Sequence, residues 1–396
     1  MNLRKSIVYT QRDYAVRRAE YAMELARAVV GTWDLVEATS FGLPEVDDRY
    51  HVWRVPIMHS DSRVGELVIS AKTGIVDVAR SSKRSSVQER IQAPDLDNSP
   101  ASWAADHSQI ISSTLRNTIL CGSSEQTLRQ LPAESVQLMF TSPPYFNARP
   151  DYSDYQTYSA YLSSVRQIIR EVHRVLEKGR FAVVNCAPVL VRRARRSESS
   201  KRLAVPFDIH QVMIDEGFDF IDDIIWQKPE GAGWATGRGR RFSADRNPLQ
   251  YKAVPVTEYV LVYRKKSTRL LDWHIRNHPD KQAVQKSKIA NGYEVTNIWK
   301  ICPTHSKHHP AIFPQELAEK VIQYYSFIGD VVLDPYAGIG TVGAAAVKLQ
   351  RRFVLGEANP EYVDRIREWA VRWLGRRAED ILCVGCAQLD LSNVLP

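Results

Sequence analysis

The sequence lacks any long hydrophobic run. Among its 396 residues there is no stretch of about 18 apolar side chains, and residues 1–16 contain no apolar segment of the kind found in a signal peptide. We therefore expect a protein that neither spans nor crosses a membrane. Cysteine is also scarce, and the five cysteines are an odd number, unlike the paired cysteines of small secreted domains. These absences favour a cytoplasmic location.

No residue class is in large excess either. Hydrophobic residues make up 44% and charged residues 25% of the chain, which excludes a wholly disordered or fibrous protein. No internal repeat is visible, and the length predicts two or three domains. The formal net charge of +8 permits a polyanionic partner, but it does not by itself require one.

The first hundred residues predict a small α+β domain of unknown role. Apolar side chains recur at helical spacing over 11–30, and the segments 50–58 and 64–78 have the composition of short strands. Residues 81–107 are rich in Ser, Asp, Pro and Ala, which predicts a linker. We place the domain boundary near residue 100, with a second domain over 101–396.

The second domain alternates strands with helices. The pattern predicts strands at 136–141, 181–185, 220–226, 258–263, 331–334 and 353–357. It predicts helices at 158–176, 206–216, 314–325 and 341–349. Such alternation is typical of an α/β fold with a mostly parallel sheet, helices on both faces, and ligands at the carboxyl ends of the strands.

A glycine-rich turn joins a strand to a helix at residues 331–343. Gly338 and Gly340 let the backbone pass close to a ligand, and a helix that begins near Thr341 offers unpaired N–H groups. A tight turn with a purely structural role would have the same glycines. With Gly343 the turn also satisfies the GxGxxG pattern of nicotinamide dinucleotide sites.

Acidic residues on either side of the turn point to the ligand. Glu357 ends the next strand, where its carboxylate could accept hydrogen bonds from ribose hydroxyls. Asp334 and Pro335 directly precede the glycines, and a carboxylate there suits a cationic group rather than a pyrophosphate. The pattern therefore favours S-adenosylmethionine, which carries an ammonium and a sulfonium, over a dinucleotide.

The tetrapeptide Ser142-Pro143-Pro144-Tyr145 follows the apolar segment 136–140. A rigid loop with two prolines is the simplest interpretation. In chemical terms, the Ser142 oxygen and the Pro143 carbonyl could both accept hydrogen bonds from one exocyclic amino group, and Tyr145 could stack on an extruded base. Two acceptors on the amine favour its attack on a methyl sulfonium, with the rest of the catalysis supplied by positioning.

The two motifs TSPPY and LDPYAGIGT resemble those of the beta group of amino-directed DNA methyltransferases, which act on N4 of cytosine or N6 of adenine. The resemblance extends over roughly 118–370 and implies a Rossmann-like S-adenosylmethionine-dependent methyltransferase sheet. It implies that Ser142, Pro143, Pro144 and Tyr145 hold the target base. It assigns the cofactor to Asp334, Pro335, Ala337, Gly338, Gly340, Thr341 and Glu357, with Phe313 and Pro314 at the methionine end. One departure is Ser123, where the family usually has an aspartate that contacts the cofactor adenine.

The serine at the head of the tetrapeptide favours N4 of cytosine by the same resemblance, and N6 of adenine stays open. Methylation at C5 of cytosine requires a nucleophilic cysteine, and Cys302-Pro303 has the reverse order of the Pro-Cys motif of the C5 enzymes. The sequence therefore predicts an S-adenosylmethionine-dependent DNA (cytosine-N4)-methyltransferase, associated with the nucleoid. An RNA methyltransferase and a catalytically idle DNA-binding module remain alternatives.

Three basic stretches, 192–202, 228–252 and 264–288, lie between the motifs. Basic runs are often only solvated surface, but their position predicts contacts to the phosphates of double-stranded DNA. The predicted contact residues are Arg192, Arg193, Arg195, Arg196, Arg238, Arg240, Arg241, Lys265 and Lys266. By the resemblance, the target-recognition region spans about 230–295, and a cognate restriction endonuclease is a further partner to consider.

A metal is not expected. Cys383 and Cys386 form at most half of a zinc site, which Cys302 and His305 would have to complete. The chemistry outlined above requires no metal.

Overall fold

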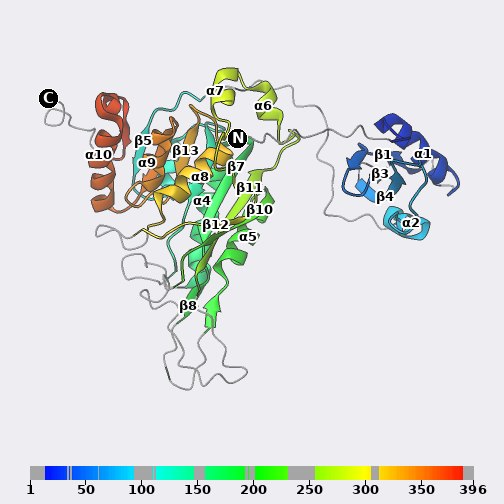
Figure 1. Cartoon of the computed structure of the whole chain (residues 1–396). Coiled ribbons are helices and arrows are strands. Elements are labelled where there is room, and N and C mark those ends of the chain that lie inside the picture. Colours follow the sequence, from blue (N-terminus) through cyan, green and yellow to red (C-terminus); the bar gives the residue numbers. More distant parts are fainter. Residues whose placement is uncertain are drawn as a thin grey trace. The chain divides into compact units, whose positions relative to one another are not determined.

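The structure is a computed structural model that describes residues 14–33, 35, 38–60, 62–92, 110, 113–146, 157–191, 195, 201–230, 255–304 and 312–386. The chain forms two compact units, residues 1–104 and 105–396 (Figure 1). Each unit is described below by itself.

The first unit packs two helices against a four-stranded antiparallel sheet. Its strands are β1 (Ser40–Phe41), β2 (Glu45–Asp47), β3 (Val52–His59) and β4 (Ser62–Ser70), and its helices are α1 (Ala19–Gly31) and α2 (Arg84–Gln92). Strand β3 pairs with β4 along its length and with β1 and β2 near its two ends. The core contains Ala22 and Ala26 of α1 together with Val55, Ile57 and Leu67 of the sheet.

The linker predicted from residue 81 is wrong over α2. Its only apolar residues are the buried Val87 and the partly buried Ile91, which both pack on the core of the unit. Two apolar residues on a polar helix of nine residues leave too little periodicity to be recognised in the sequence.

The second unit contains a nine-stranded sheet, and the predicted α/β class is confirmed. In spatial order the strands are β12 (Ile298–Lys300), β10 (Phe218–Gln227), β11 (Thr257–Lys265), β7 (Leu176–Cys186), β6 (Val136–Thr141), β13 (Val331–Asp334), β14 (Arg352–Glu357), β5 (Thr118–Cys121) and β15 (Leu382–Val384). Neighbours pair in parallel, except that β11 is antiparallel to both β7 and β10.

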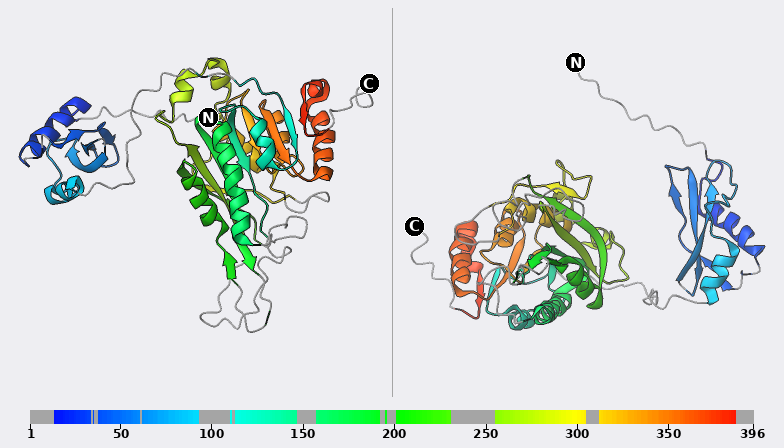
Figure 2. Two further views of the ribbon diagram at one scale, coloured as in Figure 1. Left: turned by 180° about the vertical axis from the view of Figure 1, so that it is seen from behind. Right: turned by 90° about the horizontal axis from the view of Figure 1, so that it is seen from below.

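Helices cover both faces of this sheet (Figure 2). They are α4 (Tyr158–Val175) and α5 (Val205–Asp215) on one face, and α8 (Gln315–Tyr325), α9 (Thr341–Lys348) and α10 (Pro360–Leu374) on the other. Successive side chains of a strand point to opposite faces, so Phe140 and Val332 enter the cluster under α8 and α9 while Met139 and Leu333 enter the cluster under α4. Burial on both faces explains why these central strands are almost wholly apolar.

Shorter elements complete the unit. They are α3 (Ser124–Thr127), the 3₁₀ helices Leu128–Gln130 and Gly375–Asp380, the hairpin β8 (Val189–Val191) and β9 (Lys201–Leu203), α6 (Trp273–Asn277) and α7 (Lys281–Lys286). The carboxyl ends of β6, β7, β13, β14 and β5 meet at one edge of the sheet, which we call the carboxyl edge. Strand β11 begins at this edge and ends at the opposite one, from which α6 and α7 follow (Figure 1).

Two cysteines that are distant in sequence are paired. Cys121, at the end of β5, forms a disulfide with Cys386, whereas Cys186, Cys302 and Cys383 form no disulfide among the described residues. The pairing was not predicted, and it removes Cys386 from the half zinc site considered in the sequence. The described residues contain no group of three His, Cys, Asp or Glu side chains that could hold a metal ion.

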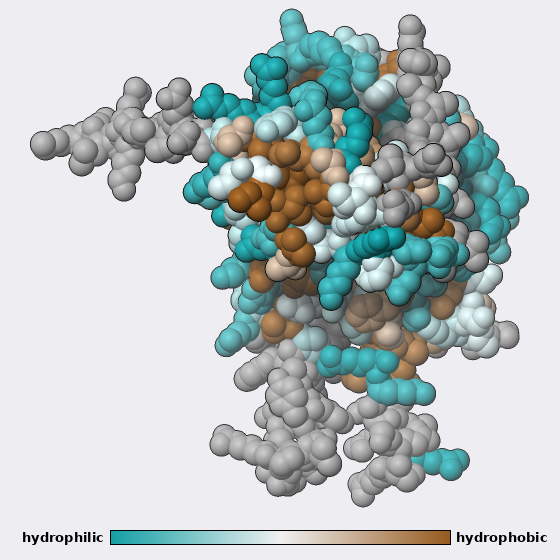
Figure 3. Space-filling model, turned by 90° about the vertical axis from the view of Figure 1, so that its right-hand side faces the viewer, coloured by the Kyte–Doolittle hydropathy of each residue, from teal (hydrophilic) through white to brown (hydrophobic). Residues whose placement is uncertain are grey.

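The surface is mostly hydrophilic on the face shown in Figure 3, where hydrophilic residues surround separate apolar patches.

In the part of the chain that the structure describes, no helix has both the length and the apolar character needed to cross a membrane.

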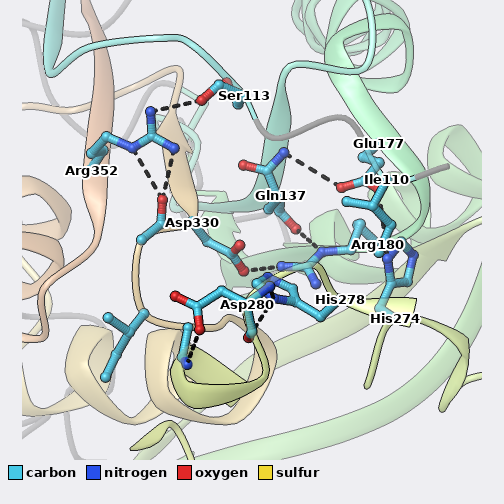
Figure 4. Close-up of a pocket in the computed structure, with 13 residues that line it drawn as sticks. Ile110, Ser113, Gln137, Glu177, Arg180, His274, His278, Asp280, Asp330 and Arg352 are labelled. Atoms are coloured by element: carbon cyan, nitrogen blue, oxygen red, sulfur yellow. Dashed lines mark hydrogen bonds and ion pairs between the residues drawn. The ribbon is translucent and has the colours of Figure 1, made fainter. Parts of the chain in front are cut away.

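The edge opposite the carboxyl edge contains a small polar cavity of about 180 Å³ (Figure 4). At its wall Arg180 forms a buried ion pair with Asp330 and donates from Nε to the Gln137 carbonyl at 3.0 Å. The carboxylate of Asp330 also accepts the Phe327 N–H at 2.7 Å. These bonds join β6, β7 and the start of β13, so the ion pair is part of the sheet core.

Because both members of this pair are buried, Arg180→Met should leave the buried Asp330 carboxylate without its ion-pair partner. We expect the free energy of unfolding to fall by about 3–5 kcal/mol, measured by urea denaturation. Arg372→Met is the control, since its partner Glu368 is exposed and an exposed pair contributes at most about 1 kcal/mol. Equal losses in the two variants would contradict this role of Arg180.

Candidate active site

A cavity of about 570 Å³ opens at the carboxyl edge of the sheet. Both sequence motifs line it, although they are far apart in the chain, because β6 and β13 are neighbouring parallel strands. Its described walls are Ser123–Glu125, Ser142–Tyr145, Ala160, Ser164, Ile168, Ile312, Phe313, Pro335–Ile339, Thr341, Gly356–Asn359 and Tyr362.

Ten of the thirteen residues predicted to hold the base or the cofactor line this cavity. They are Ser142, Pro143, Pro144, Tyr145, Phe313, Pro335, Ala337, Gly338, Thr341 and Glu357. Asp334, Pro314 and Gly340 are not among the lining residues. Pro314 instead caps the amino terminus of α8.

The glycine turn follows the predicted geometry. Gly338 and Gly340 both have positive φ, 55° and 87°, and α9 begins at Thr341 as expected. A Cβ on Gly340 would lie 2.8 Å from the Trp373 ring, so a side chain there is excluded by packing as well as by φ. At Gly343 a Cβ would lie 2.6 Å from the Leu355 side chain, so this glycine allows α9 to pack closely on β14. Close helix–strand packing is required of the third glycine in any such turn, so Gly343 does not distinguish S-adenosylmethionine from a dinucleotide.

Glu357 is fixed at the lip of the cavity by two backbone groups. Its carboxylate oxygens accept hydrogen bonds from the N–H groups of Gly338 and Asn359, each at 2.8 Å. Burial raises the pKa of Glu357, and these backbone N–H groups oppose the rise. Each oxygen keeps a further lone pair, so the carboxylate can still accept a ligand hydroxyl.

Asp334 requires a correction. The sequence predicted that this carboxylate meets a cationic group of the ligand, but only 1% of Asp334 is exposed and it does not line the cavity. Its Oδ1 accepts the Thr141 hydroxyl at 2.6 Å and the Tyr336 N–H at 3.0 Å, which joins the ends of β6 and β13. Burial raises its pKa to about 7, although both hydrogen bonds lower it.

The tetrapeptide continues directly from β6. Tyr145 is buried, and its hydroxyl donates to Glu258 Oε2 at 2.9 Å. Asn185 Nδ2 donates to the same oxygen at 2.9 Å and lies 3.5 Å from the Ser142 oxygen. Lys228 Nζ lies 2.5 Å from Glu258 Oε1. The tetrapeptide is thus held by side chains from β7, β11 and the residue after β10.

Sequence reasoning did not identify Asn185, Lys228 and Glu258 as site residues. Asn185 ends the strand predicted at 181–185 and Glu258 begins the one predicted at 258–263, whereas Lys228 lies two residues after the strand predicted at 220–226. A polar residue next to a predicted strand end was therefore the available signal. It does not indicate which of these polar residues contact one another in the folded protein.

Phe313 lines the cavity and packs on Phe140 of β6, with ring centroids 5.1 Å apart. Phe140 is fully buried in the sheet core, so it supports Phe313 from behind. The predicted position of Phe313 in the pocket is therefore compatible with the structure.

The basic residues predicted to contact DNA have mixed positions. Arg192, Arg193, Arg196, Arg238, Arg240 and Arg241 lie outside the described residues, and Arg195 is exposed. Lys265 is a wrong prediction: it is buried, and its Nζ donates to the Leu176 carbonyl at 2.7 Å. Burial also lowers its pKa.

Lys266 is exposed, but like Lys265 it lies at the end of β11 opposite the cavity. The described part of the basic stretch 264–288 follows from that edge. Its predicted place beside the catalytic strand ends is therefore wrong, because β11 runs antiparallel to its neighbours.

Comparison with known proteins places this site in context. Residues 136–368 match the family model described as DNA methylase, N6_N4_Mtase. The type II beta methyltransferase M.BslI of Bacillus sp. (strain NEB-606) is 26% identical over 270 residues, which are 65% of this chain but 28% of that protein. The type II methyltransferase M.Cfr9I of Citrobacter freundii is 26% identical over 278 residues, 62% of this chain and 85% of that protein.

A solved structure gives a similar result. It is a protein of Thermus thermophilus described as a candidate DNA modification methylase, in complex with S-adenosyl-L-methionine. It is 27% identical to this chain with a TM-score of 0.52, and the match covers 68% of this chain and 99% of the Thermus chain. The residues matched by the family model, 136–368, all lie within the second unit.

The raised pKa of Asp334 makes stability depend on pH. Its folded-state pKa of about 7 exceeds the ordinary value of 3.8, so the native state holds the proton more tightly and stability falls as pH rises from about 4 to about 7. Asp334→Asn removes this loss. The quantity to compare is the Tm of the variant minus the Tm of the wild type. We expect this difference to be larger at pH 8 than at pH 4.5 by at least about 2–4 °C.

Thermal unfolding without cofactor at the two pH values measures this difference. Asp364→Asn is the control, because Asp364 is an exposed aspartate paired with Arg367. A Tm difference for Asp334→Asn that does not change with pH would show that the carboxyl is not the titrating group.

Proposed function

Because the chain belongs to the N6/N4 DNA methylase family, we propose that it methylates the exocyclic N4 amino group of cytosine in double-stranded DNA. It is an S-adenosylmethionine-dependent DNA amino-methyltransferase. The observation that carries the proposal is that Ser142–Tyr145 and the glycine turn line one cavity at the carboxyl edge of the sheet. The hydrogen-bond acceptors of the tetrapeptide and the glycine turn therefore lie together at the carboxyl ends of the strands, where α/β sheets bind their ligands.

The residues at this edge suit S-adenosylmethionine. Glu357 would accept hydrogen bonds from the ribose, the backbone of Ala337 and Gly338 would follow the cofactor closely, and Phe313 would cover its methionine end. When bound, the cofactor supplies an electrophilic methyl group on a sulfonium. Asp334 would not contact the cofactor itself. It would fix Pro335 and Tyr336 in the cavity wall, since its carboxylate accepts hydrogen bonds from the Thr141 hydroxyl and the Tyr336 N–H.

The tetrapeptide would hold the target base outside the DNA helix. The Ser142 oxygen and the Pro143 carbonyl would accept the two amine hydrogens, and Tyr145 and Pro144 would pack on the base. The amine nitrogen then forms the new bond to the methyl carbon as the sulfonium–methyl bond breaks, which leaves a neutral thioether. The excess amine proton leaves through Ser142 to water.

Cytosine N4 is supported by Ser142, the residue type that the sequence resemblance associates with N4 enzymes. The relatives M.BslI and M.Cfr9I are named as type II methyltransferases. Their names support a place for this chain in a restriction-modification system with a cognate endonuclease. N6 of adenine is the alternative within the same family.

Target recognition fits the connection between β10 and β11. Strand β10 ends at Gln227 and β11 begins at Thr257, and both residues lie at the carboxyl edge beside the tetrapeptide. The connection therefore starts and ends next to the cavity, and it includes the predicted contacts Arg238, Arg240 and Arg241. We accordingly narrow the recognition region from 230–295 to this connection.

Transfer of labelled methyl groups to plasmid DNA tests the activity. Digestion to nucleosides and mass spectrometry should yield N4-methylcytosine. N6-methyladenine would change the base assignment, and preferential transfer to structured RNA in competition would replace DNA as the substrate. Absence of transfer to either would contradict the proposed function and leave a DNA-binding role.

Two substitutions separate the base-binding and cofactor-binding roles. Ser142→Ala should lower kcat about 10²-fold or more, because it removes an acceptor for the amine, while the Kd for S-adenosylmethionine changes little. Glu357→Gln should raise that Kd about tenfold, because hydrogen bonds to a charged group are the stronger ones, with a smaller effect on kcat.

Steady-state kinetics and calorimetric titration measure these effects. Ser135→Ala is a matched control, since Ser135 precedes the other end of β6 and donates to the Pro132 carbonyl. The reverse pattern in the two variants would contradict the assigned roles.

A further inference from the structure

Glu258 interacts with side chains from separate segments of the chain, namely the tetrapeptide, β7 and the residue after β10. Its Oε2 accepts both the Tyr145 hydroxyl and the Asn185 amide at 2.9 Å, and its Oε1 lies 2.5 Å from Lys228 Nζ. We call these four residues the Glu258 cluster. Glu258 itself is part of β11, so the cluster ties the tetrapeptide to β7, β10 and β11.

The Glu258 cluster is shielded from water. The side chain of Glu258 is 7% exposed and that of Lys228 is 19% exposed, while Asn185 is almost fully buried. The Lys228 ammonium also lies 4.4 Å from the centre of the buried Trp226 ring. Hydrogen bonds in such an environment hold their partners more firmly than they would in water.

The carboxylate fixes which way the Asn185 amide points. An ionised carboxylate only accepts hydrogen bonds, so the amide must present Nδ2 to Glu258. The same Nδ2 then lies 3.5 Å from the Ser142 oxygen. Within the described residues, Asn185 Oδ1 is left buried without a hydrogen-bond partner, an arrangement that costs stability. The orientation that points Asn185 Nδ2 toward Ser142 therefore leaves Asn185 Oδ1 without a hydrogen bond among the described residues.

Ser142 gains a defined hydrogen-bond arrangement from this placement. Its oxygen has two lone pairs, and a donor from Asn185 occupies one of them, which leaves the other for an amine hydrogen. The present 3.5 Å separation is long, but such contacts in ligand-free sites often shorten in the reactive complex.

We propose that Glu258 is a positioning residue for methyl transfer, which fixes the Tyr145 ring and orients the Asn185 amide toward Ser142. This inference rests on the proposed function of the tetrapeptide. Glu258 contacts neither substrate nor cofactor in this scheme and acts only through Tyr145 and Asn185.

A double-mutant cycle tests the proposal. Tyr145→Phe removes the hydroxyl donor, and Glu258→Gln replaces one carboxylate oxygen with an amide donor, so that the side chain can no longer accept hydrogen bonds at both of its ends. Both substitutions keep the approximate shape of the side chain. Each should lower kcat on plasmid DNA about tenfold, since small displacements of reacting groups cost this much or more. The double variant should be little slower than the slower single variant, because coupled residues are non-additive. The Kd for S-adenosylmethionine should stay within about twofold of wild type.

Two controls match these substitutions. Glu177→Gln changes another buried carboxylate with a cationic neighbour, Arg269, at the opposite edge of the sheet. Tyr263→Phe changes a second buried tyrosine, which lies in β11 and not in the tetrapeptide. Neither control should lower kcat by more than about twofold.

Multiplicative losses in the double variant would overturn the proposal, as would a wild-type kcat in Glu258→Gln. If Glu258→Gln does not fold, Tyr145→Phe compared with Tyr263→Phe decides, and equal rates in that pair also overturn it. A wild-type protein that transfers no methyl group would instead refute the proposed function, so the two failures are distinguishable.

Discussion

The hydrogen bond from the Thr141 hydroxyl to Asp334 links the two parts of the site. Thr141 ends β6 and Asp334 ends β13, the strands from which the tetrapeptide and the glycine turn depart. A second bond from the Tyr336 N–H sets the direction of the turn on the same carboxylate. The distance between the tetrapeptide and the glycine turn therefore depends on one buried acid. Its burial is costly, and the cost is visible in its raised pKa.

Three carboxylates lie at the carboxyl edge, Asp334 and Glu258 buried and Glu357 half-buried, and each has a separate task. Asp334 joins two strand ends, Glu357 shapes the lip of the cavity through two backbone N–H groups, and Glu258 gathers side chains around the tetrapeptide. In all three the acid organises donors that belong to distant parts of the sequence. Pre-organised polar groups of this kind are what an enzyme needs when positioning supplies most of its rate.

The sequence was sufficient for those parts of the fold that follow from local pattern. The strand at 136–141 is found as predicted, and the helix predicted at 158–176 is α4, because apolar runs and helical periodicity are local signals. Strand β7 is longer than predicted, since Leu176–Arg180 includes polar residues whose partners are supplied by the rest of the fold. The edge strands β12 and β15 have three residues each, too few to show a period.

Within the site, the motif residues were predictable and their supports were not. Ser142 and Gly338 lie in recognisable patterns, whereas Glu258 meets Asn185 and Lys228 only after three strands have paired. Charge was the least reliable signal: Lys265 is as basic as any residue of its stretch, yet it is buried at the far edge. A run of basic residues gives no information about the direction of the strand that leads into it.

The antiparallel course of β11 has a consequence for how such a protein can diversify. Because β10 and β11 form a hairpin-like pair, the sheet register is set without the connection between Gln227 and Thr257. Insertions or exchanges beyond Lys228 in that connection therefore need not move the strands that carry Asn185 and Glu258. In the recognition role proposed for this connection, the segment that reads DNA would be exchangeable while the tetrapeptide and its supports stay fixed, and a graft from a relative would be a route to altered specificity.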